Sequence, residues 1–209
     1  MVHPDLEQFR RTASHGALVP VYREIVADLE TPVAAYLKIT QAQQYSFLLE
    51  SVEHTGTLGK HSFLGANPSI VFRSKGREVS IFRQGVEERS EHDQPMELLR
   101  ALMRAYQPVQ MPGLPEFHGG AVGYMSYDTV RFFETLPDNN PDPLALPDLY
   151  WLITDTLLVF DHVRNKIQIV SNVHVGDDVD AAYEEGVAKI RVIEEQLRAP
   201  GVFAARGGV

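Results

Sequence analysis

Three residues near the end of an apolar segment have side chains that can bind a free amino acid. Glu50 and Ser51 directly follow the apolar run 45–49, and Lys60 comes nine residues later. A carboxylate pairs with an ammonium group, a hydroxyl donates or accepts a hydrogen bond, and an ammonium pairs with a carboxylate. Together these groups match the charged head of an amino acid. The alternative is a structural ion pair between Glu50 and Lys60, with Ser51 in a turn.

Other patterns that commonly carry chemistry are incomplete. The eight histidines include no pair three or four residues apart, the spacing of helical metal sites. His54 and His61 stand near Glu50 and Glu53, but ordinary surface histidines are far commoner than such a metal site. The segment 56–61 lacks the first glycine and the hydroxyl of a phosphate-binding loop. We therefore expect no catalytic set and no metal site within these 209 residues.

Composition favours a globular cytoplasmic protein. Nineteen Lys and Arg stand against 28 Asp and Glu, which gives a formal net charge of −9. This acidic balance lacks the basic footprint of nucleic-acid binders, so we expect no nucleic-acid partner. Cysteine is absent, which excludes disulfides and fits a reducing compartment. No segment approaches the roughly 20 apolar residues of a membrane span, so we expect no membrane contact.

Helices are predicted from capping residues and hydrophobic spacing. A polar helix is predicted at 6–17, a two-turn helix begins at Thr31-Pro32, and a third covers about 96–106. A further helix is predicted to start near Asp128. The last helix follows Asp177 or Asp178 and buries a stripe at helical spacing. The residues of that stripe are Val179, Tyr183, Val187, Ile190, Ile193 and Leu197.

Strands are predicted from β-rich runs between turn residues. The run 45–52 is predicted as a strand covered on both faces, and 70–83 as a hairpin with Gly76 in its turn. The acidic stretch 87–95 is predicted as a solvated loop. Glycines in 119–128 indicate a strand that another backbone approaches closely. A second hairpin is predicted over 149–175 around 161–165.

These elements predict an α+β fold with a largely antiparallel sheet and flanking helices, because strands and helices do not alternate regularly. We expect one domain over 1–198. The Gly-rich end, 199–209, has the composition of a linker or a truncated end.

Several motifs follow one another in a specific order. They are the segments 20–25, 29–33, 48–51 with 59–65, and 119–131. From about Pro20 to the last helix, this ordered set resembles the N-terminal region of anthranilate synthase component I, a chorismate-utilising enzyme in two parts.

The resemblance implies a role in tryptophan biosynthesis. The intact enzyme would convert chorismate and ammonia to anthranilate and pyruvate, with Mg²⁺ held by the C-terminal half and ammonia supplied by a glutamine amidotransferase subunit, component II. L-tryptophan would inhibit it by feedback. Carried over to this sequence, Glu50 would face the ammonium of the inhibitor and Ser51 its polar head. Lys60 would lie nearby, and Pro20 and Val21 would supply pocket wall.

The resemblance also limits what this chain is expected to do alone. The other pocket wall and the magnesium ligands belong to the C-terminal half of the family, so we expect the chain alone to be inactive and to bind tryptophan weakly. Two alternatives stay open. One is aminodeoxychorismate synthase component I of the folate pathway, and the other is a stand-alone amino-acid-binding module.

Overall fold

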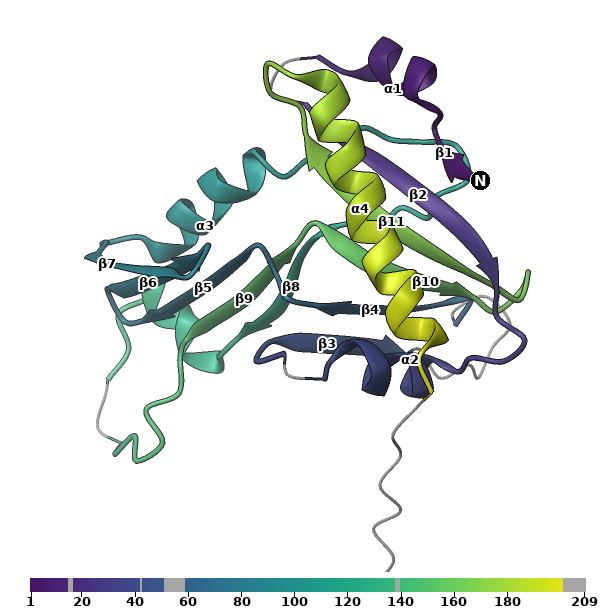
Figure 1. Ribbon diagram of the computed structural model, residues 1–209. Coiled ribbons are helices and arrows are strands. Elements are labelled where there is room, and N and C mark those ends of the chain that lie inside the picture. Colours follow the sequence, from purple (N-terminus) through teal and green to yellow (C-terminus); the bar gives the residue numbers. More distant parts are fainter. Residues whose placement is uncertain (15–16, 42, 51–58, 138–139, 201–209) are drawn as a thin grey trace, which may run out of the picture. The chain divides into compact units, whose positions relative to one another are not determined.

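The computed structural model describes residues 1–200 except 15–16, 42, 51–58 and 138–139 (Figure 1). The chain forms two compact units, which are described separately. The first comprises 1–67, 108–118 and 155–209, and the second 68–107 and 119–154. Each contains an antiparallel sheet and at least one helix, which confirms the predicted α+β class. Most of the expected terminal linker, from residue 201 on, lies outside the described residues.

The first unit is a six-stranded antiparallel sheet with helices. Its strands lie in the order β1-β2-β11-β10-β4-β3. The strands are β1 (Val2–His3), β2 (Leu18–Val26), β3 (Ser46–Glu50), β4 (His61–Ala66), β10 (Thr156–Asp161) and β11 (Lys166–His174). The helices are α1 (Leu6–Thr12), α2 (Pro32–Ile39) and α4 (Val179–Arg198). Helix α4 runs across one face of this sheet (Figure 1).

The capping and packing of α4 confirm its prediction. Asp178 caps the helix, because its carboxylate accepts a hydrogen bond from the Ala181 N–H at 2.9 Å. The predicted stripe lies in or against the main core, where α4 meets strands β2, β11, β10 and β4. The core includes Ile190, which is fully buried, and Val187. On the opposite face, Leu114 and Phe117 of the connector 108–118 pack against a smaller cluster.

Helix α2 is capped as the sequence predicts, whereas α1 is shorter than expected. Thr31 accepts a hydrogen bond from the Ala34 N–H at 3.1 Å, and Pro32 opens α2. Helix α1 ends at Thr12 rather than near residue 17. The reason is tertiary, because the Ala17 carbonyl accepts a hydrogen bond from the Val175 N–H at 2.9 Å and the chain there is already extended towards β2.

Strand β3 is an edge strand with one face exposed, so the prediction of cover on both faces was wrong. Its only described strand partner is β4. Alternate side chains point to opposite faces. Accordingly, Leu48 packs against the main core, whereas Leu49 is 44% exposed.

The second unit is a five-stranded antiparallel sheet in the order β7-β6-β5-β9-β8. Its elements are β5 (Ile70–Lys75), β6 (Glu78–Arg83), β7 (Val86–Glu91), α3 (Pro95–Arg104), β8 (Gly120–Met125), the 3₁₀ helix η1 (Tyr127–Phe132) and β9 (Leu149–Thr154). Helix α3 packs Leu99 against Phe72, Val79 and Leu149. The β5–β6 hairpin is confirmed, with Gly76 at φ +52° in its turn.

Two strand predictions in this region were wrong. The stretch 87–95, expected as a loop, forms most of β7, whose residues are exposed and pair with β6. The run 149–160, expected as one strand, divides at Asp155 into β9 and β10, which belong to different sheets. Asp155 is held by other elements of the first unit. Its carbonyl accepts from the Asn172 N–H at 2.7 Å, and its carboxylate pairs with Lys189 at 3.0 Å.

None of the helices in the described part of the chain has the length and apolar character needed to cross a membrane.

Candidate functional site

The structure brings Glu50 and Lys60 to the same end of the β3–β4 pair. Glu50 is the last residue of β3 and lies directly opposite Ser62 of β4. Directly opposed side chains share a face of the sheet. Leu48 and Leu64, two residues further into the pair, point into the main core, so Glu50 and Ser62 lie on that helix-covered face too. Lys60 immediately precedes β4, and both Glu50 and Lys60 are exposed.

No side-chain partner is seen for the charged groups of Glu50 and Lys60 among the residues that the structure describes. Within the described ranges of the chain, neither the Glu50 carboxylate nor the Lys60 ammonium forms an ion pair or a side-chain hydrogen bond. The structural alternative, an ion pair between the two, is therefore not observed. Ser51 lies outside the described residues, so its contact with a ligand stays a prediction.

Pro20 and Val21 lie elsewhere in the same sheet. Three strands, β11, β10 and β4, separate β2 from β3. The register across them places Glu50 in line with Ile25, five residues along β2 from Pro20. Val21 is fully buried in the main core, where its Cγ2 would lie 3.3 Å from a Cβ added at Gly186 of α4. The structure thus places Val21 in the core and brings neither residue beside Glu50.

His162 is a residue near this site that sequence reasoning missed. It follows β10, and its backbone N–H donates to the Lys60 carbonyl at 2.9 Å. Its Nε2 lies 2.8 Å from the Ser62 Oγ. Ser62 and His162 are 100 residues apart in sequence, so no local spacing could have indicated the contact. Only the pairing of β4 with β10 brings them together.

A pocket of about 560 Å³ opens beside His162. It is lined by the β2–α2 loop, 27–32, and by residues around the β10–β11 turn, including Phe160 and Asp161. Its carboxylates are largely occupied by neighbouring protein groups. Glu30 forms an ion pair with Lys38, and Asp161 accepts backbone N–H groups of the turn at 2.9 and 3.0 Å. Among the residues that the structure describes, no group of three or more His, Asp or Glu side chains is arranged to hold a metal ion.

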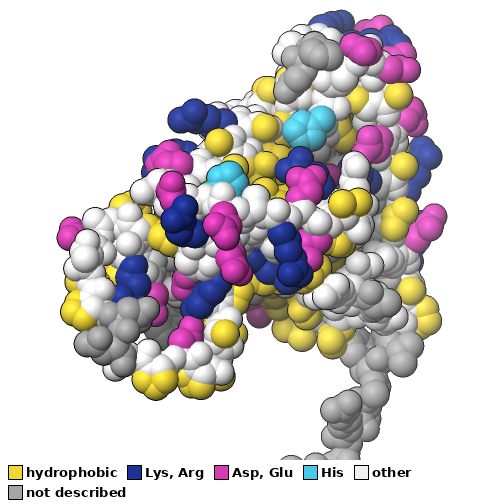
Figure 2. Space-filling model, turned by 90° about the vertical axis from the view of Figure 1, so that its left-hand side faces the viewer, with side chains coloured by type: hydrophobic (Ala, Val, Ile, Leu, Met, Phe, Trp, Pro, Cys, Tyr) yellow, Lys and Arg dark blue, Asp and Glu magenta, His cyan; other side chains and the backbone are white. Residues whose placement is uncertain are grey.

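A second acidic group in the first unit belongs to the sheet surface. Glu24 of β2 accepts hydrogen bonds from Lys166 at 2.7 Å and from Gln168 at 3.0 Å, both on β11. The hydrogen bond from Lys166, followed by that from Gln168, lowers the pKa of the Glu24 carboxyl. Acidic and basic side chains are interspersed over the face that Figure 2 shows. The Glu24 group therefore has the character of a stabilising cross-strand network.

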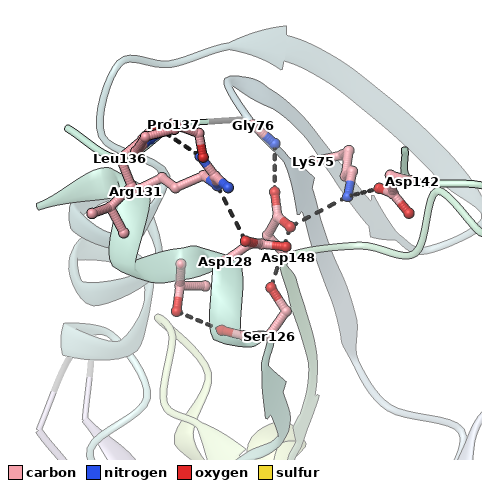
Figure 3. A network of polar contacts seen from close by, with 10 residues as sticks. Lys75, Gly76, Ser126, Asp128, Arg131, Leu136, Pro137, Asp142 and Asp148 are labelled. Carbon is pink, nitrogen blue, oxygen red and sulfur yellow. Dashed lines mark hydrogen bonds and ion pairs between the residues drawn. The ribbon is translucent and has the colours of Figure 1, made fainter. Parts of the chain in front are cut away.

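The second unit has its own polar network, centred on Asp148 (Figure 3). Asp148 is 7% exposed, and its carboxylate accepts from the Gly76 N–H at 2.7 Å and from the Ser126 hydroxyl at 3.2 Å. Lys75 lies 3.4 Å from the same carboxylate and 2.6 Å from Asp142. Each of these contacts connects two groups of this chain. We therefore assign this network to the folding of the β5–β6 turn against the start of β9.

The comparisons with known proteins point to one family of enzymes. A family model described as chorismate binding enzyme matches residues 44–206. Anthranilate synthase component 1 of Thermus thermophilus is 40% identical over 193 residues, which are 90% of this chain and 38% of the relative. The same protein of Acetivibrio thermocellus is 34% identical over 197 residues, 94% of this chain and 40% of the relative. The chain thus spans about two-fifths of the length of these relatives.

A solved structure is also similar. Anthranilate synthase component I from Streptococcus pneumoniae TIGR4 aligns with a TM-score of 0.49 and 24% identity, covering 85% of this chain and 37% of that one.

Proposed function

This chain belongs to the chorismate binding enzyme family, and we propose that it is the N-terminal part of an anthranilate synthase component I. Relatives with that name, 34% and 40% identical over at least 90% of the chain, carry the proposal. The whole enzyme would act in the cytoplasm and convert chorismate and ammonia to anthranilate and pyruvate. Since the chain spans about two-fifths of those relatives, the activity is proposed for the longer protein.

Within that enzyme, we propose that this chain contributes part of an L-tryptophan site. Glu50 and Lys60 support this role because both are exposed, and no described residue pairs with their charges. The Glu50 carboxylate would accept hydrogen bonds from the ammonium of the amino acid, with the Ser51 hydroxyl beside it and Lys60 close to the carboxylate. Charge-assisted hydrogen bonds of this kind are among the stronger polar contacts.

Feedback inhibition would follow from preferential binding of tryptophan to a less active arrangement of the enzyme. The strength of the inhibition is then limited by the difference in affinity between the two arrangements. Substitutions at Glu50 or Lys60 should weaken binding of the inhibitor without altering turnover, because these residues would contact only the inhibitor.

The proposed metal and partner belong to the rest of the enzyme. The described residues include no group of three or more His, Asp or Glu side chains arranged to hold Mg²⁺, and we propose that the part of the enzyme beyond this chain would hold the metal. Ammonia would come from the glutamine amidotransferase subunit, component II.

Product analysis of the longer protein tests the enzymatic assignment. Incubated with chorismate, ammonium and Mg²⁺, it should form anthranilate, identified by fluorescence and chromatography. A para-amino product would instead identify aminodeoxychorismate synthase component I. Formation of neither aromatic amine, with amino-acid binding retained, would identify a stand-alone binding module.

Inhibition of the same protein tests the tryptophan site. Glu50→Gln and Ser51→Phe should each raise the tryptophan concentration for half-inhibition at least tenfold, with kcat within twofold of wild type. Glu91→Gln, at an exposed carboxylate on β7, is the matched control and should leave inhibition unchanged. Wild-type inhibition of the Glu50 and Ser51 variants would refute the site.

A further inference from the structure

His162 holds the start of β4 through two contacts. Its backbone N–H donates to the Lys60 carbonyl at 2.9 Å, and its Nε2 lies 2.8 Å from the Ser62 Oγ. The β4–β10 ladder ends at the pair His61 and Asp161, so His162 is the next residue along β10. It therefore fixes the residues on either side of His61, one through the backbone and the other through its side chain.

Both residues held in this way bear on the proposed tryptophan site. Lys60 is one of its charged residues, and Ser62 lies directly opposite the other, Glu50. β3 is an edge strand whose described strand partner is β4, so the position of Glu50 depends on the position of the start of β4. Ser62 is 2% exposed. A buried hydroxyl needs a hydrogen-bond partner, and the His162 ring is such a partner.

We propose that His162 is a positioning residue of the tryptophan site: it sets the start of β4 and thereby the placement of Lys60 relative to Glu50. The inference rests on the proposed function. The described polar contacts of His162 are with the Lys60 carbonyl and the Ser62 hydroxyl rather than with either charged side chain, so it acts through the Lys60 backbone and through Ser62. The ammonium and the carboxylate of the amino acid would be held by Glu50 and Lys60. Affinity falls when these two side chains are no longer preorganised for binding.

The surroundings of His162 permit a conservative substitution at this position. His162 is exposed and lines the pocket of about 560 Å³ between the β2–α2 loop and the β10–β11 turn. Glutamine therefore has space there, and its amide can replace the ring nitrogen as hydrogen-bond partner of Ser62. A substitution at Val163, 73% exposed in the same turn, provides a matched control.

The test uses the longer protein that carries this chain. For each variant, the tryptophan concentration for half-inhibition is measured with kcat and KM for chorismate. We expect His162→Ala and Ser62→Ala each to raise that concentration three- to tenfold and the double variant to raise it no further than the larger single effect. His162→Gln should return it to within twofold of wild type. In all variants kcat and KM should stay within twofold, and Val163→Ala should match wild type.

Ser62→Ala removes the same hydrogen bond with a smaller change, so the test stands even where His162→Ala fails to fold. Tryptophan inhibition of wild type with unchanged inhibition of Ser62→Ala and His162→Ala would overturn this inference and leave the proposed function intact. Absence of inhibition in wild type would overturn the tryptophan site itself. A lower kcat, a higher KM and weaker inhibition together, not restored in His162→Gln, would show a merely structural role and overturn the inference too.

Discussion

Replacing Gly123 by alanine tests the close approach of β8 to β9. Gly123 lies directly opposite Trp151. A Cβ added at Gly123 would lie 2.0 Å from the Tyr150 carbonyl oxygen and 2.8 Å from the Trp151 Cα. Both are backbone atoms, which cannot turn aside as a flexible side chain can. Since Cβ atoms essentially never lie closer than 3.0 Å to another heavy atom, the two strands must separate by about 1 Å at this point.

The cost follows from that separation. A ladder hydrogen bond of about 2.9 Å is lost when it lengthens by about 1 Å. Antiparallel pairing places about two such bonds next to a given residue, each worth about 1 kcal/mol, and residual crowding adds about 1–3 kcal/mol. We therefore expect Gly123→Ala to lower the free energy of unfolding by about 3–5 kcal/mol, a large share of the total for a typical domain.

Urea unfolding followed by tryptophan fluorescence measures this loss locally. Trp151 is the single tryptophan of the chain and belongs to the strand that the new methyl group would displace. Gly176→Ala is the control, because a Cβ there meets nothing within 4 Å, and its effect should stay within about 0.5 kcal/mol. A loss below about 1 kcal/mol for Gly123→Ala would refute the backbone-contact explanation of this glycine.

Three further predictions concern polar groups. Asp148→Ala should destabilise the second unit by about 2–3 kcal/mol in the same fluorescence assay, because it leaves the Gly76 N–H without its partner; an effect below about 0.5 kcal/mol would contradict this. Glu194→Ala should cost about 1–3 kcal/mol, measured by circular dichroism, since it leaves Arg23 without the partner that lies 2.6 Å away; unchanged stability would refute that account. Glu24→Gln should make the free energy of unfolding depend less on pH under acidic conditions. The pKa of Glu24 is lowered below 4.5 in the folded state, so its contribution is present above about pH 4.5 and is lost as the pH falls through the folded pKa; an unchanged acid profile would contradict this.

Much of the local structure could be predicted from the sequence. Helix α4 combines an Asp178 cap with a stripe at helical spacing, and the β5–β6 turn has a glycine where φ is positive. These signals act between residues close in sequence, so neighbours alone determine them. The glycine of β8 was also a correct signal, because only a residue without a Cβ permits the approach to Tyr150.

The failures came where partners distant in sequence decided the outcome. The acidic stretch 87–95 shows no strand periodicity, yet most of it pairs with β6 along an exposed edge. The run 149–160 is uniformly β-rich, and only the contacts of Asp155 with Asn172 and Lys189 show where one strand ends and the next begins. Edge pairing and the division between sheets depend on those distant partners.

The candidate site divides in the same way. Residue types alone identified Glu50, Ser51 and Lys60 as a set able to bind the head of an amino acid, because charge and hydrogen-bonding capacity belong to the side chains themselves. The family resemblance added Pro20 and Val21 to this set, whereas three strands of the sheet separate β2 from β3 and Val21 lies in the core. The role of His162 could be seen only in the tertiary structure, because antiparallel pairing brings it to Ser62, 100 residues away in sequence.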